Sequence, residues 1–276
     1  MIDTKKTADL ENNVAEGNSI VSLDIINSIS IRPSEEIVIN SWEQFGKLSK
    51  LSWQTAISYT FCLEMVALVY LLSQVSKEED NLAAITQITG LINTLVCVSI
   101  SPLLAMSLVA GKDLGRLNEA VANGEAEEQL LSRKERISAV LRNGLIIAVP
   151  MTIVAGLPMI FSKDILIKFF NQKPAVAQIT QNFVRPYAIA VPGIMIRIVT
   201  SQIMFMFGRT KPAMIIGFGS LLVGMTIGCI YAYGWLGAPK LGNDGIMIGA
   251  ILNEWATAIL YAGYIAWSPR LKNYNF

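Results

Sequence analysis

Six long apolar segments dominate this chain, and each is long enough to cross a membrane as a helix. About 20 apolar residues span the hydrocarbon core of a bilayer when they form an α-helix. The segments cover residues 51–75, 82–110, 137–161, 176–207, 212–236 and 245–267. The ten-residue alternation of a membrane β-barrel is absent from them, so helices are the way to satisfy the backbone in lipid. We therefore predict an all-α integral membrane protein with a six-helix bundle over residues 49–267.

Composition narrows the chemistry available to such a bundle. Only 16% of the residues are charged, against about 25% in soluble domains. The chain has no histidine, which removes the commonest general base and metal ligand. Its three cysteines lie far apart within apolar segments, unlike the spacing of metal sites. We expect no enzyme activity, no cofactor, no bound metal and no nucleic-acid partner.

The regions outside the segments predict the topology. Residues 1–48 are largely polar and lack a signal-peptide pattern, so we expect a mostly disordered cytoplasmic tail. Residues 111–136 form a charged cytoplasmic loop, within which 119–136 reads as one amphipathic helical stretch, and residues 268–276 form a cytoplasmic end.

Lysine and arginine concentrate on one set of flanks, which predicts that both termini lie in the cytoplasm. We expect the bundle to lie in a cytoplasmic (inner) membrane. The cytoplasmic set is Arg32, Lys47, Lys50, Lys112, Arg116, Arg133, Lys134, Arg136, Arg209, Lys211, Arg270 and Lys272. The opposite set is Lys77, Lys163, Lys168, Lys173 and Lys240.

Three ionisable residues lie inside the apolar segments: Glu64, Arg197 and Glu254. A charge at the bilayer centre costs at least about 2.5 kcal/mol, so such groups face a cavity or each other. We predict that Glu64 and Glu254 form a cation or proton coupling site. Arg197 is then the counter-charge or part of a substrate cavity. The alternative is a structural ion pair that locks helices together.

Polar, small and proline residues complete the candidate site. Asn93, Gln202 and Asn253 are expected to supply hydrogen bonds around the substrate cavity. Asn93 belongs to a polar and small stripe at helical spacing that should face protein or water: Thr86, Gly90, Asn93, Cys97 and Ser101. Proline removes a helical hydrogen bond, so Pro192 and Gly193 are predicted to form a hinge in the fourth segment.

Residues 101–105 (SPLLA) and 110–112 (AGK) resemble the end of the second helix in the multidrug and toxic compound extrusion (MATE) transporter family. Residues 171–176 (NQKPAV) look like the outer loop before its fourth helix. Residues 191–193 (VPG), followed by 207–212 (FGRTKP), are the most specific match, and 245–250 (GIMIGA) resembles the start of the sixth helix. The resemblance covers residues 53–267.

This resemblance implies a proton- or sodium-coupled antiporter that exports amphipathic organic compounds. Members of the family have two six-helix bundles with the substrate between them. This sequence holds one bundle, most like the amino-terminal one, so it resembles half of such a transporter and would need a second bundle from itself or another chain. It also has Leu68 where many relatives carry an aspartate, and Glu64 lies one turn earlier.

Two other functions are compatible with the sequence. The first is a flippase for lipid-linked substrates from the same superfamily, for which Arg197 is the one hint of a basic groove. The second is a truncated membrane interaction protein without transport activity. The substrate class and the second bundle are expectations that follow from the resemblance.

Overall fold

The computed structural model describes residues 49, 60–75, 79–125, 127–268 and 271, and within them every regular element is a helix. The α-helices are α4 (Thr60–Val75), α5 (Glu79–Leu104), α6 (Met106–Ala122), α7 (Glu127–Ile160), α8 (Ser162–Lys168), α9 (Pro174–Tyr187), α10 (Val191–Met206), α11 (Thr210–Tyr233) and α12 (Asn243–Trp267). Two 3-10 turns, Ala188–Ala190 and Trp235–Gly237, complete the set. The predicted all-α fold is confirmed. The predicted tail, residues 1–48, lies outside the described residues.

Five helical stretches among the described residues are long and apolar enough to cross a membrane. They are Asp80–Ala122, Glu128–Ile160, Pro174–Met206, Thr210–Tyr233 and Asn243–Trp267. Helix α4, of which 16 residues are described, is the sixth member of the bundle and corresponds to the first predicted segment. The predicted order of membrane helices is therefore approximately that of the structure.

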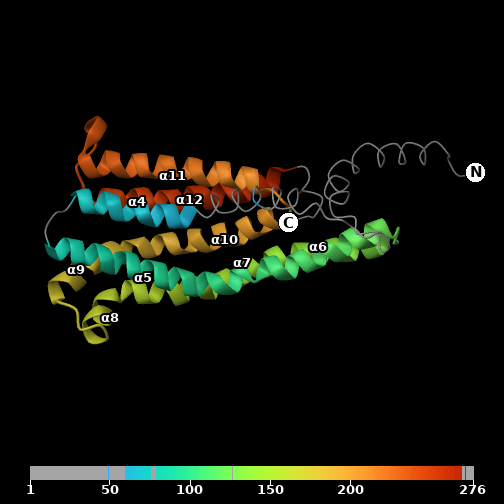
Figure 1. Ribbon diagram of the computed structural model, residues 1–276, viewed down its shortest axis with the longest axis horizontal. Helices are drawn as coiled ribbons and strands as arrows, with labels where there is room; N and C mark the ends of the chain where they lie inside the picture. Colours follow the sequence, from blue (N-terminus) through green and yellow to red (C-terminus); the bar gives the residue numbers. More distant parts are fainter. Residues whose placement is uncertain (1–48, 50–59, 76–78, 126, 269–270, 272–276) are drawn as a thin grey trace, which may run out of the picture.

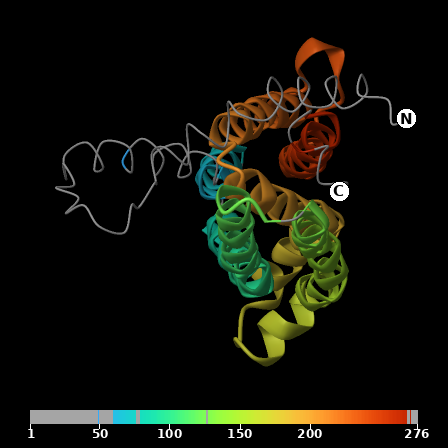
Figure 2. The same ribbon diagram turned by 90° about the vertical axis from the view of Figure 1, so that its right-hand side faces the viewer.

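Helix α10 lies at the centre of the bundle. Twelve of its sixteen residues are buried, including Arg197 and Gln202. Figures 1 and 2 show α11 and α12 on one side of α10, with α5 and α7 on the other. An apolar helix that is buried on almost all sides is an interior helix of its bundle. Polar groups on α10 must therefore find partners within the protein.

Helices α6 and α7 form a hairpin that projects beyond the ends of the other helices (Figure 1). Ala120 and Ile137 are fully buried between the two helices, and Leu117 is nearly so. Arg133 fastens the hairpin, because its guanidinium donates to the carbonyl oxygen of Arg116 at 2.8 Å and to Glu125 Oε2 at 2.8 Å.

The structure corrects the prediction of a loop with one amphipathic helix over residues 119–136. Helix α6 continues to Ala122 and α7 begins at Glu127, so two helix ends meet in a short turn. Gly124 has a φ of +68°, and its N–H donates to Val121 O while that of Glu125 donates to Ala120 O. This is a Schellman cap, which ends a helix at a glycine. The prediction was wrong because the charged residues of a helix in water have the same composition as a loop.

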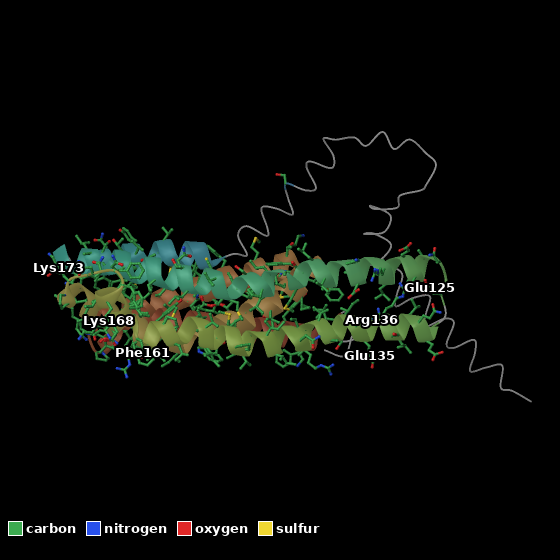
Figure 3. All side chains as sticks on the ribbon, turned by 90° about the horizontal axis from the view of Figure 1, so that it is seen from below. Glu125, Glu135, Arg136, Phe161, Lys168 and Lys173 are labelled. Carbon is green, nitrogen blue, oxygen red and sulfur yellow. The ribbon has the colours of Figure 1, made fainter. Side chains whose placement is uncertain are left out.

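The opposite end of the bundle contains the short helix α8 and the start of α9. Figure 3 shows Phe161, Lys168 and Lys173 at this end, far from Glu125 and Arg136. Helix α8 occupies residues 162–168, between the third and fourth predicted membrane segments. Its buried Leu166 holds it against the bundle.

Candidate functional site

A buried ion pair joins the central helix to α12. Arg197 Nε lies 2.8 Å from Glu254 Oε2, and Arg197 Nη2 donates to Glu254 Oε1 at 3.1 Å. The side chains are 4% and 0% exposed, so water does not screen the pair. Of the predicted ionisable residues, these two are brought together. This geometry is that of the structural clamp that the sequence left open as an alternative.

Two further contacts strengthen the junction between α10 and α12. The indole Nε1 of Trp255 donates to the carbonyl oxygen of Ile189 at 3.0 Å. Ile189 lies in the 3-10 turn that interrupts the fourth membrane segment just before Pro192. A Cβ at Gly193 would lie 3.4 Å from the backbone nitrogen of Trp255. The predicted hinge residues therefore adjoin a change of helical geometry and pack closely against α12.

Tyr261 and Trp255 are residues that the sequence reasoning did not select. The hydroxyl of Tyr261 is buried and donates to the carbonyl oxygen of Ala213 at 2.9 Å, which links α12 to α11. A buried Tyr or Trp needs a partner for its polar atom. This rule could have identified both residues from the sequence, because both occur within a long apolar segment.

Asn253, next to Glu254, borders a small cavity between α4, α11 and α12. The cavity has a volume of about 20 Å³, which is room for one water molecule. Its other walls are apolar or glycine, and include Leu68 of α4. Asn253 is 4% exposed, and its Oδ1 accepts no hydrogen bond from any described residue. Buried polar atoms are nearly always satisfied, so this acceptor is suited to a small donor or cation.

Glu64 belongs to α4, but its side chain lies outside the described part of the chain. Its position is four residues before Leu68, so both positions share one face of the helix. Leu68 lines the cavity that Asn253 borders. The role of Glu64 in coupling stays a prediction.

Asn93 is separate from this buried group and lies on the surface of α5. Its Oδ1 accepts a hydrogen bond from Cys97 Sγ at 3.4 Å on the same helix. All five members of the predicted polar and small stripe are exposed: Thr86, Gly90, Asn93, Cys97 and Ser101. Gln202 is instead buried on α10. The structure thus divides the predicted polar residues into an interior group and a face on α5.

The family model described as MatE matches residues 132–230, from α7 into α11. The multidrug resistance protein NorM of Vibrio cholerae serotype O1 is 30% identical over 141 residues, which are 51% of this chain and 31% of NorM. The multidrug resistance protein MdtK of Yersinia pestis (strain Pestoides F) is 29% identical over 133 residues, covering 48% of this chain and 29% of MdtK. The matched segments therefore span less than a third of these relatives.

The fold extends the likeness over the whole chain. The crystal structure of the eukaryotic MATE transporter AtDTX14 superimposes with a TM-score of 0.65 and covers 98% of this chain. The sequence identity in that comparison is 12%, so it shows the shared fold alone. The chain thus resembles MATE transporters in sequence over residues 132–230 and in fold over 98% of its length, and it corresponds to 55% of the length of AtDTX14. Its long apolar helices are those of an integral membrane protein.

Proposed function

We propose that this chain is a MATE family member that supplies one bundle of a cation-coupled transporter, which exports amphipathic organic compounds. The bundle lies in the cytoplasmic (inner) membrane with both termini in the cytoplasm, and it works by alternating access with a second six-helix bundle. Multidrug resistance proteins NorM and MdtK are the relatives that support efflux as the activity.

The exposed polar face of α5 is the observation that carries this proposal. Its members recur every three or four residues along a helix that is otherwise apolar enough to span a membrane. Polar side chains on a membrane helix are expensive against lipid and normally face protein or a water-filled path. A second bundle against α5 would give this face such an environment. Since the chain matches 55% of AtDTX14, a full-length relative has room for that bundle.

Coupling is assigned to Glu64 rather than to Glu254. The Glu254 carboxylate already has a cationic partner at 2.8 Å, so binding another cation would require that contact to break. Position 64 lies on the face of α4 that borders the Asn253 cavity, where one acceptor oxygen has no partner among the described residues. A carboxylate beside that oxygen would form a minimal site for a proton or sodium ion.

Chemical crosslinking tests the second bundle. We would keep the native Cys97 on the α5 face, replace the other two cysteines with serine, and treat membranes with a short bis-maleimide. Cys97 should crosslink the chain to a second copy or to another MATE-type chain. A matched control places the single cysteine at Ile215, which is 67% exposed on α11. Absence of any Cys97-specific product would contradict a bundle at this face.

Transport measurements test the coupling. In the assembly that exports ethidium, Glu64→Gln should abolish the dependence of efflux on pH or sodium while the protein still inserts. Glu64→Asp keeps the charge and should retain the dependence. Efflux by Glu64→Gln with unchanged ion dependence would show that coupling lies elsewhere.

Neither alternative function gains support from the described residues. The flippase hypothesis depended on Arg197 lining a groove open to lipid, but Arg197 is 4% exposed and paired with Glu254. A membrane interaction protein without transport would give no ethidium efflux in any assembly, which the transport measurement tests.

A further inference from the structure

Helix α8 and its flanks present an aromatic surface that efflux does not require. Phe161, Phe169 and Phe170 are 53%, 81% and 60% exposed. Apolar surface costs about 25 cal/mol per Å² when it stays in water, and a phenylalanine side chain offers about 150–250 Å². Three exposed rings on one short segment therefore indicate a surface that something apolar covers.

Phe161 and Phe169 flank α8 (Ser162–Lys168) on the same side, and Phe170 follows directly after Phe169. Positions 161, 165 and 169 are four residues apart and share a helical face. Ser162 and Leu166 lie on the other face and are 0% and 2% exposed. The short helix is thus oriented by its buried face, and its aromatic face points outward.

Polar contacts hold α8 in this orientation. Lys163 Nζ donates to Gln178 Oε1 on α9 at 2.6 Å. The side-chain amide of Gln181, also on α9, donates to the carbonyl oxygen of Ile160 at 3.1 Å. These contacts fix both the start of α8 and the end of α7.

The surface next to α8 shows what covers the rings. Helix α7 is a candidate membrane span, and its exposed side chains include Val149, Ile153 and Leu157, which recur every four residues. The same row continues through the half-exposed Ile160 to Phe161 at the end of the bundle (Figure 3). The aromatic surface of α8 therefore continues the lipid-facing surface of α7.

We propose that α8 is an interfacial anchor, with Phe161, Phe169 and Phe170 inserted just below the phospholipid headgroups of the leaflet opposite the α6–α7 turn. Lys168 is exposed beside Phe169, and it extends its ammonium group towards the phosphates. Aromatic residues beside lysine are typical of the membrane–water boundary. The anchor fixes how deeply the bundle sits in the membrane. It also fixes the depth of α9, with which the fourth membrane segment begins.

Spin labelling of the full chain in phosphatidylcholine and phosphatidylglycerol nanodiscs tests the anchor. A nitroxide is attached to single cysteines at Phe161 or Phe169 after the native cysteines are replaced with serine. Collisions with oxygen, which concentrates in lipid, are compared with collisions with a water-soluble nickel chelate. Ile153 on α7 provides a lipid reference, and the exposed Glu135 provides an aqueous reference. Labels at 161 and 169 should have an oxygen-to-nickel ratio severalfold above that at 135 and below that at 153.

Two outcomes would overturn the anchor. Nickel access equal to that at position 135 would place the rings in water, and exclusion of both reagents would place them against protein. A second comparison tests Lys168, since Lys168→Glu should lower the ratio at position 169 by repulsion from the phosphates, whereas Lys168→Arg should not. An identical ratio in both variants would contradict the phosphate contact.

Discussion

Breaking the Arg197–Glu254 pair should be among the most damaging single changes to this bundle. Removal of one partner from a buried pair costs about 3–5 kcal/mol, because an uncompensated charge stays buried. With exposures of 4% and 0% and contacts of 2.8 and 3.1 Å, this pair meets the conditions for that cost. Arg197→Met and Glu254→Gln should each lower the free energy of unfolding by about 3–5 kcal/mol.

The chain contains a matched control with the same contact length. Arg133 Nη2 lies 2.8 Å from Glu125 Oε2, but these side chains are 32% and 28% exposed. Solvent screens such a pair, so Glu125→Gln should cost only about 0.2–1 kcal/mol. Burial, not distance, is then the variable that separates the two experiments.

Unfolding in mixed micelles with increasing dodecyl sulfate, followed by circular dichroism, measures these differences. The double variant Arg197→Met/Glu254→Gln, which combines the same two substitutions, should recover most of the loss, because it leaves no charge in the core. Losses below about 1 kcal/mol for both single variants would refute the reasoning, since that is the cost at a solvated pair. Strict additivity in the double variant would equally show that the two side chains are not coupled.

Three further predictions concern packing, topology and motion. Gly249→Ala should lose about 1–3 kcal/mol of stability, because the new Cβ would lie 2.5 Å from a backbone oxygen of α11. Gly219→Ala, with nothing within 4 Å, should cost nothing in the same unfolding assay, and equal losses would contradict the packing argument. A water-soluble maleimide added outside intact cells should label a cysteine at Lys240 but not at Lys134; the reverse pattern would invert the topology. Pro192→Ala should slow ethidium efflux while protein levels in the membrane stay unchanged, and a normal rate would argue against a hinge there.

Hydropathy located the membrane helices well because lipid solvation acts on each segment separately. The segment predicted at 212–236 is α11, Thr210–Tyr233, and it ends where Gly234 adopts a φ of +74°. The segment predicted at 245–267 is α12, Asn243–Trp267. Both depend on local composition, which the sequence carries directly.

The partner of Arg197 depended on tertiary contacts and could not be chosen from the sequence. Glu64 and Glu254 both lie inside apolar segments, so either residue could have been the partner of Arg197. The pairing with Glu254 joins residues 57 positions apart and depends on how α12 packs against α10. The continuation of α6 and α7 past the apolar segments was missed for another reason. Hydropathy does not distinguish a helix in water from a loop, and Gly124 alone marked the turn.

The α6–α7 hairpin is long enough for a small tilt of the bundle to move its tip by a measurable distance. The stretch from Asp80 to Ala122 has 43 residues, or about 64 Å of helix, of which the hydrocarbon core takes only about 30 Å. A bundle tilt of about 10° would move a tip that extends roughly 30 Å from the membrane by about 5 Å. Because Arg133 holds the tip in place, a fluorophore at the exposed Asn123 would report rocking of the bundle.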